Sequence, residues 1–161
     1  TALYASAGDA AAFRFVDDHF DVLRGAIAAA GGTVVKTMGD AVMAAFVDDA
    51  TCARAAFGCL VAFDAFRRKT THAGVTQIKL GIHGGPCYVV TANGSLDFFG
   101  QTVNVAARLQ GLAESGEVVL ESEALSRLPT ELRKGLVASE PFQARVKGVA
   151  EPLTLVRVKL A

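Results

Sequence analysis

The order in which helical and strand-like hydrophobic patterns follow one another constrains the fold of this chain more than any other feature. Apolar residues recur at helical spacing over residues 9–30, and two strand-like runs then flank a Gly39-Asp40 turn. A second helical pattern and an alternating strand come next. The predicted order is therefore helix, strand, strand, helix and strand, over residues 9–30, 33–38, 41–46, 48–69 and 77–83.

This order is that of a βαββαβ sheet without its first strand. In that topology the first strand is central, and a sheet that lacks it would expose two unpaired edges. We therefore expect the natural protein to have residues before Thr1 that supply this strand.

The second half of the chain is predicted to add short elements to this unit. Asn93-Gly94 is typical of a hairpin turn, and Thr102 has a side chain that can cap a helix. The predicted elements are strands at 87–91 and 117–120, helices at 103–114 and 123–128, and a last hairpin of residues 142–146 and 153–159.

The composition excludes several classes of protein. The chain has 16 Lys and Arg residues against 16 Asp and Glu residues, so it lacks the charge excess of proteins that bind nucleic acid or anionic membranes. No apolar run approaches the roughly 20 residues that span a bilayer, and the start of the chain lacks the pattern of a signal peptide. The 3 cysteines form no CxxC pair, and the 3 histidines are scattered. We predict one reduced, cytoplasmic domain over residues 1–161, with no membrane segment and no nucleic-acid partner.

Three sequence motifs occur in an order and at spacings that resemble one enzyme family. They read GGTVVKTMGDAVMAAF from Gly31, LGIHGGPCYVVTANGSLDFFGQTVNVAARLQGLAESGEVVL from Leu80, and VKGVAEPLTLVRV from Val146. Together they resemble the catalytic domain of the class III adenylyl and guanylyl cyclases, and the likeness runs from Leu3 to Val158. The resemblance implies an α+β fold with a ferredoxin-like, palm-type βαββαβ sheet and helices on one side. It also implies a head-to-tail homodimer with active sites at the interface.

The activity implied by the resemblance is that of an adenylate cyclase, which converts ATP to 3′,5′-cyclic AMP and pyrophosphate. The ribose 3′-OH attacks the α-phosphate of its own nucleotide, and this chemistry depends on positioning and charge stabilisation. Two Mg²⁺ or Mn²⁺ ions, which prefer carboxylate ligands, would supply much of that stabilisation. Asp40 corresponds to one of the two metal-binding aspartates of the family. The other belongs to a segment that would end at Thr1, so we expect it just before Thr1.

Lys36 and Asp97 correspond to the residues that recognise the base. Adenine presents an acceptor at N1 and a donor at its 6-amino group, which fit a lysine ammonium and a carboxylate. Guanine reverses the two, and a mismatch would leave polar groups unpaired. The resemblance therefore implies ATP as the substrate.

Three further residues correspond to those that bind the ribose and the phosphates. Asn104 and Arg108 are four positions apart on a predicted helix and share a face. In the family the Asn orients the ribose, and the Arg stabilises the charge of the transition state, for which a guanidinium is well suited. Lys147, in the VKG turn, resembles the lysine that binds the terminal phosphates.

Other functions fit the same sequence. Taken singly, Asp40, Lys36, Asp97 and Lys147 also suit ordinary turns, strands and loops. The chain could be a degenerate cyclase-homology domain that binds a nucleotide or a partner without turnover, or a purely structural dimerisation module. Because cyclases of this family are usually output domains, the resemblance also implies fused sensor or regulatory domains outside residues 1–161.

Overall fold

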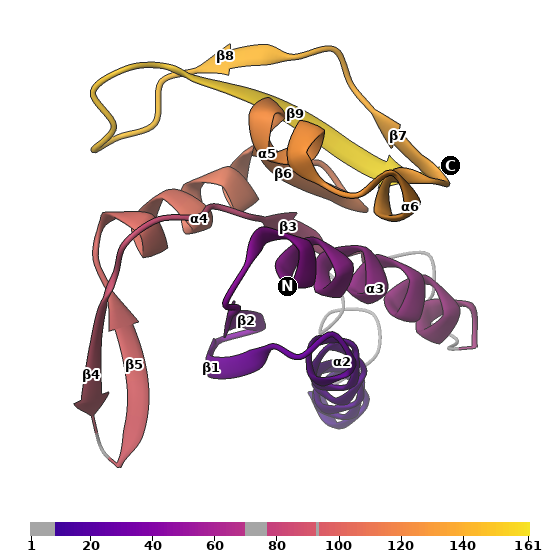
Figure 1. The fold of residues 1–161 in the computed structure, drawn as a ribbon. Helices are drawn as coiled ribbons and strands as arrows, with labels where there is room; N and C mark the ends of the chain where they lie inside the picture. Colours follow the sequence, from indigo (N-terminus) through magenta and orange to yellow (C-terminus); the bar gives the residue numbers. More distant parts are fainter. Residues whose placement is uncertain (1–8, 70–76, 93) are drawn as a thin grey trace.

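The computed structural model describes residues 9–69, 77–92 and 94–161 (Figure 1). The predicted elements occur in the predicted order, and short elements that were not predicted lie between them. In chain order they are α2 (Asp9–Ala29), β1 (Thr33–Met38), β2 (Ala41–Ala45), α3 (Asp49–Arg68), β3 (Lys79–Gly81), β4 (Tyr88–Ala92), β5 (Ser95–Phe99), α4 (Gln101–Leu112), β6 (Glu117–Glu121), α5 (Ser122–Arg127), α6 (Thr130–Arg133), β7 (Leu136–Ala138), β8 (Phe142–Ala144) and β9 (Leu153–Leu160).

The capping residues explain where the predicted helices begin. The carboxylate of Asp48 accepts a 2.8 Å hydrogen bond from the backbone N–H of Thr51, so α3 begins where the sequence predicts. The predicted cap of α4 is wrong. Gly100 precedes this helix, and Thr102 lies inside it, where its hydroxyl donates a 2.6 Å hydrogen bond to the carbonyl of Pro86.

The strands form three hydrogen-bonded groups. β1 with β2 and β4 with β5 are antiparallel hairpins, while β3, β6, β9 and β7 form a sheet in that order, with β8 also paired to β9. β3 and β6 are parallel, and β9 is antiparallel to its neighbours. Among the described residues no strand pairs with both β2 and β3, although both contribute to one core cluster with Leu23, Ile27 and Cys59. The βαββαβ topology places its first strand at this position. The predicted Asn93-Gly94 turn falls partly on Asn93, which lies outside the described residues.

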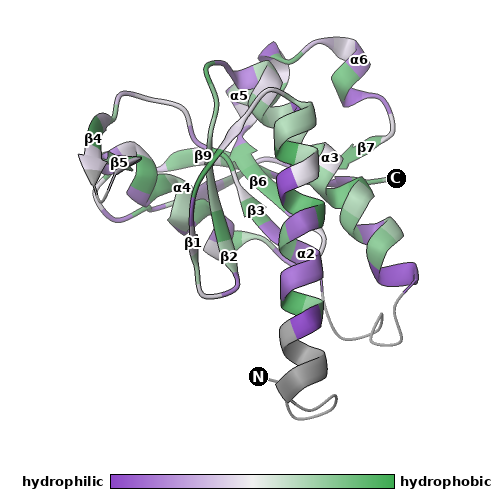
Figure 2. Ribbon diagram, turned by 90° about the horizontal axis from the view of Figure 1, so that it is seen from below, coloured by the Kyte–Doolittle hydropathy of each residue, from purple (hydrophilic) through white to green (hydrophobic). Residues whose placement is uncertain are grey.

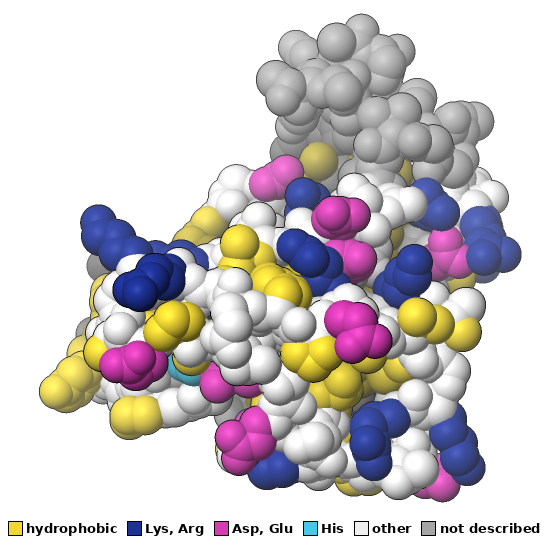
Figure 3. Space-filling model, turned by 90° about the horizontal axis from the view of Figure 1, so that it is seen from above, with side chains coloured by type: hydrophobic (Ala, Val, Ile, Leu, Met, Phe, Trp, Pro, Cys, Tyr) yellow, Lys and Arg dark blue, Asp and Glu magenta, His cyan; other side chains and the backbone are white. Residues whose placement is uncertain are grey.

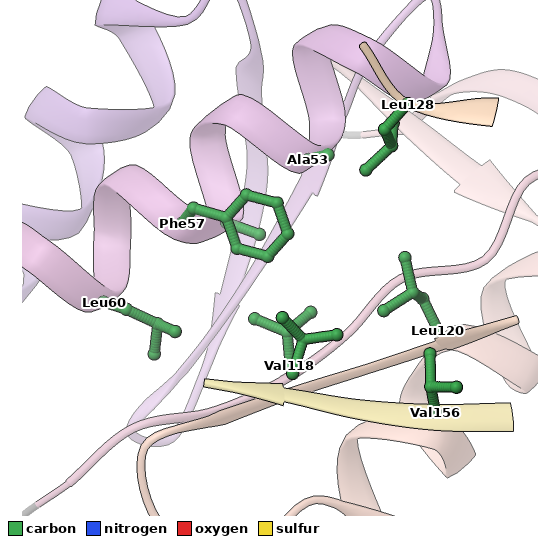
Figure 4. Close-up of a cluster of buried hydrophobic side chains, with 9 residues drawn as sticks. Ala53, Phe57, Leu60, Val118, Leu120, Leu128 and Val156 are labelled. Carbon is green, nitrogen blue, oxygen red and sulfur yellow. The ribbon is translucent and has the colours of Figure 1, made fainter. Parts of the chain in front are cut away.

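Helices cover the larger sheet on both faces, so the prediction of helices on one side is wrong while the α+β class is confirmed. One face packs against α3 (Figure 4), in a cluster that includes Ala53, Phe57, Leu60, Val118, Leu120, Val156 and Val158. The opposite face packs against α4, in a cluster that includes Val105, Leu109, Val119 and Leu155. The reason is that β6 and β9 carry apolar residues at successive positions. Since neighbouring side chains point to opposite faces of a strand, both faces must be covered.

The β4–β5 hairpin stands away from the sheet and from the helices α2 and α3 (Figures 1 and 2). It pairs only within itself among the described strands, and large apolar side chains on it remain exposed: Tyr88, Val89, Val90, Leu96 and Phe99. A two-stranded ribbon of this kind is marginally stable on its own. An exposed apolar patch usually marks a contact surface.

The charged side chains of the molecule do not form a single basic or acidic surface on the face that Figure 3 shows. Lys and Arg side chains are interspersed with Asp and Glu over this face. None of the described helices combines the length and the hydrophobicity that a bilayer span requires.

Gly81 of β3 lies directly against the backbone of α4. A Cβ at this position would overlap with the backbone nitrogen of Gln110 and the carbonyl oxygen of Ala106. We expect Gly81→Ala to lower the free energy of unfolding by about 3 kcal/mol, because a helix backbone cannot move aside as a side chain can. Urea denaturation measures this. Gly111→Ala is the control on α4, since no atom lies within 4 Å of the added Cβ, and it should be neutral or stabilise by up to about 1 kcal/mol. Equal stability of Gly81→Ala and the wild type would contradict this close packing.

Candidate active site

Lys36 and Asp97 are 61 positions apart in the sequence, and the fold brings their charged groups into contact. The Lys36 Nζ atom lies 2.9 Å from Oδ1 and 2.8 Å from Oδ2 of Asp97. Lys36 comes from β1, where the register with β2 shifts between Val34 and Lys36, and Asp97 comes from β5. Irregularities of this kind redirect a side chain out of the regular alternation of a strand. The two residues predicted to recognise a base therefore form one charged pair.

The pair is partly shielded from solvent, and most of the donors and acceptors of its two charged groups already have hydrogen-bond partners. The side chain of Lys36 is 36% exposed and that of Asp97 is 18% exposed. The backbone N–H of Phe98 donates a further 2.8 Å hydrogen bond to Oδ1 of Asp97. The hydrogen bonds from Lys36, and then that from Phe98, lower the pKa of Asp97 below its ordinary value, so this carboxyl group is ionised at neutral pH.

Asp40 lies at the tip of the β1–β2 hairpin. The preceding residue, Gly39, has a φ of +62°, a left-handed conformation that glycine adopts without steric cost. The Asp40 side chain is exposed. In the described part of the chain no hydrogen bond or ion pair joins its carboxylate to Lys36, Asp97 or Arg108.

A buried histidine connects α2 to this turn. His19 is 7% exposed, lies within hydrogen-bonding reach of the backbone of Val16 and of Asp40, and is edge-on to Phe63 with 6.3 Å between ring centroids. Burial lowers the pKa of His19 below 6.5, and it outweighs the opposing effects of the hydrogen bonds and of the Asp40 charge. The imidazole is therefore neutral at pH 7, and its single N–H can donate to only one of these two backbone groups at a time.

The helix α4 and the loop after β8 form a second polar group. Asn104 is exposed and Arg108 is half-buried, four residues apart on one face of α4. The Arg108 guanidinium donates a hydrogen bond to the backbone carbonyl of Lys147. Gly148, with a φ of +87°, completes this turn beside Arg108, and a Cβ added there would lie 3.5 Å from its Nη1 atom. The predicted phosphate-binding residues Arg108 and Lys147 thus lie together.

The structure places the predicted site residues in separate groups. Lys36 contacts Asp97, and Arg108 contacts Lys147 with Asn104 on the same helix face, whereas Asp40 contacts none of them. Within the described ranges no cluster of three or more His, Cys, Asp or Glu side chains could hold a metal ion. A single exposed carboxylate still fits Mg²⁺, which commonly keeps several waters and takes one or two carboxylates together with substrate phosphates.

Two residues of this region were not singled out from the sequence. His19 was not assigned a role because the histidines lack ligand spacing, yet it falls four residues after Phe15 and four before Leu23 on the buried face of α2. Phe99 lies two residues after Asp97 and therefore on the same face of β5, with its ring centroid 5.3 Å from Lys36 Nζ. Strand alternation could have indicated Phe99 once Asp97 was assigned.

Comparison with known proteins gives consistent matches. The family profile described as "Adenylate and Guanylate cyclase catalytic domain" matches residues 1–156. The adenylate cyclase of Anabaena cylindrica is 34% identical over 167 residues, covering 91% of this chain and 32% of that protein. Adenylate cyclase 2 of Rhizobium meliloti (strain 1021) is 29% identical over 142 residues, covering 80% of this chain and 39% of that protein. The chain thus corresponds to less than half the length of each of these relatives.

The fold also matches solved structures. A structure of the adenylate cyclases from Trypanosoma brucei in their monomeric state superposes with a TM-score of 0.75 at 23% identity, covering 98% of this chain and 83% of that one. The likeness therefore extends over nearly the whole of this chain.

Proposed function

Since the chain belongs to the adenylate and guanylate cyclase catalytic domain family, we propose that it converts ATP to 3′,5′-cyclic AMP and pyrophosphate. The observation that carries the choice of ATP is the contact between Lys36 and Asp97. Relatives described as adenylate cyclases support the same reaction.

The hydrogen-bonding capacity left on this pair fits adenine. A lysine ammonium has three N–H donors, and an ionised carboxylate accepts about four hydrogen bonds. Two donors of Lys36 point to Asp97, and Oδ1 of Asp97 already accepts from both Lys36 and Phe98. What remains is one donor on Lys36 and one acceptor site on Oδ2 of Asp97. These complement the N1 acceptor and the 6-amino donor of adenine, whereas guanine presents the opposite groups at the same two positions.

Arg108, Lys147 and Asn104 would act on the rest of the nucleotide. In the reaction a bond forms between the ribose 3′-oxygen and the α-phosphorus, the bond from that phosphorus to the bridging oxygen breaks, and the hydroxyl proton is released. A guanidinium is always charged and offers donors in a fixed fork, so Arg108 suits the negative charge that develops at the α-phosphate. Lys147 suits the leaving pyrophosphate, and the Asn104 amide can orient the ribose.

Asp40 would hold a divalent cation. Two Mg²⁺ or Mn²⁺ ions would polarise the phosphate and favour ionisation of the 3′-hydroxyl. Asp40 is exposed on a turn that contains Gly39 and lies next to His19. Among the described residues its carboxylate forms no ion pair that would compete with a cation.

A second copy of this chain would complete the site. Asp40 does not contact the base-binding or phosphate-binding groups of its own chain, so we propose that it serves a site with Lys36, Asp97 and Arg108 of the partner. The exposed apolar side chains of the β4–β5 hairpin fit a contact surface in such a head-to-tail homodimer.

Incubation of the purified domain with equal concentrations of ATP and GTP and with Mn²⁺ tests the proposal. We expect cyclic AMP to form with little cyclic GMP, measured by chromatography of the products. Equal use of both nucleotides would contradict the assignment of Lys36 and Asp97. Binding of ATP without any product, seen as a higher unfolding temperature with ATP, would instead support a nucleotide-binding domain without turnover.

A further inference from the structure

We infer that Phe99 is a positioning residue, whose aromatic ring holds the Lys36 ammonium beside Asp97 and thereby sets the preference for ATP over GTP. This inference rests on the proposed function and adds a residue to the recognition of the base. The main observation is that Lys36 Nζ lies 5.3 Å from the centroid of the Phe99 ring while it also contacts both carboxylate oxygens of Asp97.

The strand geometry places Phe99 and Asp97 next to the same ammonium group. Residues two apart on a strand point to the same face, so Asp97 and Phe99 both face Lys36 of the neighbouring hairpin. The carboxylate accepts hydrogen bonds, whereas the ring offers the negative face of its π system to the cation. The ammonium is therefore held by two contacts of different kinds, which together restrict it more than the ion pair alone.

The exposure of Phe99 to solvent argues against a role limited to packing in the hydrophobic core. Its side chain is 48% exposed, and it belongs to none of the buried clusters around the sheet. Tyr88 lies directly opposite Phe99 on β4 and is still more exposed, at 79%, but no cation lies over its ring among the described residues. Tyr88 therefore provides a matched control on the same hairpin.

The position of Lys36 matters because its side chain has four rotatable bonds. Without the ring, the ammonium can keep one hydrogen bond to Asp97 while moving away from the place where the adenine N1 atom would bind. Affinity for ATP would then fall, while the groups on α4 that act on the α-phosphate would be unchanged. Loss of Phe99 should therefore change KM and base preference more than kcat.

Kinetics with ATP and GTP on four proteins test this inference: the wild type, Phe99→Leu, Phe99→Tyr and Tyr88→Leu. Leucine keeps an apolar side chain but removes the π face, so we expect KM for ATP to rise about two- to fivefold, with kcat changed less than about twofold. The ratio of kcat/KM for ATP to that for GTP should fall by a similar factor. Phe99→Tyr should retain the wild-type values because it keeps the ring. Tyr88→Leu should keep the wild-type ratio, whatever its effect on total activity.

The outcomes distinguish this inference from the proposed function. If the wild type prefers ATP and Phe99→Leu keeps its KM and its ratio, the role of Phe99 is wrong and the cyclase function stands. An equal fall of the ATP-to-GTP ratio of kcat/KM in Tyr88→Leu would also overturn the inference. So would a fall of this ratio in Phe99→Tyr when the unfolding temperature of that variant is unchanged. If the wild type forms no cyclic AMP, the dissociation constants for ATP and GTP decide instead. If the wild type binds ATP more tightly than GTP and Phe99→Leu reduces this difference, the inference is supported. If the difference is unchanged in Phe99→Leu, or absent in the wild type, the inference is wrong.

Discussion

Replacing Asp40 with Asn is expected to reduce the rate of cyclic AMP formation by about two to three orders of magnitude while the fold remains intact. Asparagine keeps the size and the hydrogen bonding of the side chain but removes the charge that would hold a divalent cation. Because Asp40 is exposed on a turn, its charge contributes little to the core, and surface substitutions usually change stability by less than about 0.5 kcal/mol. Initial rates over a series of Mn²⁺ concentrations, together with thermal unfolding, measure both effects.

An exposed aspartate on α2 provides the control for this experiment. Asp18→Asn removes the same charge from another exposed position and should leave the rate and its dependence on Mn²⁺ unchanged. If Asp40→Asn retained wild-type turnover with Mn²⁺, Asp40 would be an ordinary turn residue, and the proposed metal site would lie elsewhere.

Mixing two inactive variants is expected to restore roughly a quarter of the wild-type activity. Asp40→Ala and Arg108→Ala homodimers should each be nearly inactive, because every shared site lacks either the metal-binding carboxylate or the guanidinium. In a heterodimer of the two, both lesions fall in one site and the other site is intact. Random pairing of equal amounts makes roughly half of the dimers heterodimers, each with one functional site of two.

Subunit exchange must be shown independently, for example by energy transfer between labelled chains. Mixing Asp40→Ala with Asp40→Asn is the control and should restore no activity, since every site then lacks the carboxylate. If exchange occurs and the mixture of Asp40→Ala with Arg108→Ala remains inactive, each chain builds its own site and the shared-site arrangement is wrong.

Local sequence signals predicted the first half of the fold closely. The β1 strand has the predicted limits, and α3 begins at the Asp48 cap, because turn and capping signals act over a few residues. Short elements such as β7 and α6 were not predicted. They span only 3 and 4 residues and are held by pairing with β9 and by packing, which local patterns do not reveal.

The faces of the helices were predicted less well than their limits. On α2 the helical spacing favours a row of Phe13, Val16, Phe20, Leu23 and Ile27. The structure buries Leu23 and Ile27 of this row, but it also buries Phe15 and His19 and leaves Val16 and Phe20 half-buried. Because His19 is polar, it interrupts the apolar pattern that would have indicated the row from Phe15 to Leu23. Its burial is possible because the ring is neutral and backbone groups of Val16 and Asp40 lie within reach of its N–H.

The candidate site could be located from the sequence only through the motifs. Residues 61 positions apart carry no local signal that they meet, so the contact of Lys36 with Asp97 depends on how β1 and β5 pack. The same holds for Arg108 and the Lys147 carbonyl, which lie on different elements. Asp40 could be assigned to its turn from Gly39 alone, but its separation from the other groups required the structure.

The ion pair between Lys36 and Asp97 also fastens one hairpin to another. The β4–β5 hairpin makes no strand pairing with the described sheet, and this pair ties it to β1. The groups that would select the base are thus also an anchor for the exposed apolar hairpin. A change of base preference at these two positions would therefore alter how that hairpin is held, and evolution of a new substrate would have to preserve an attachment as well as a binding site.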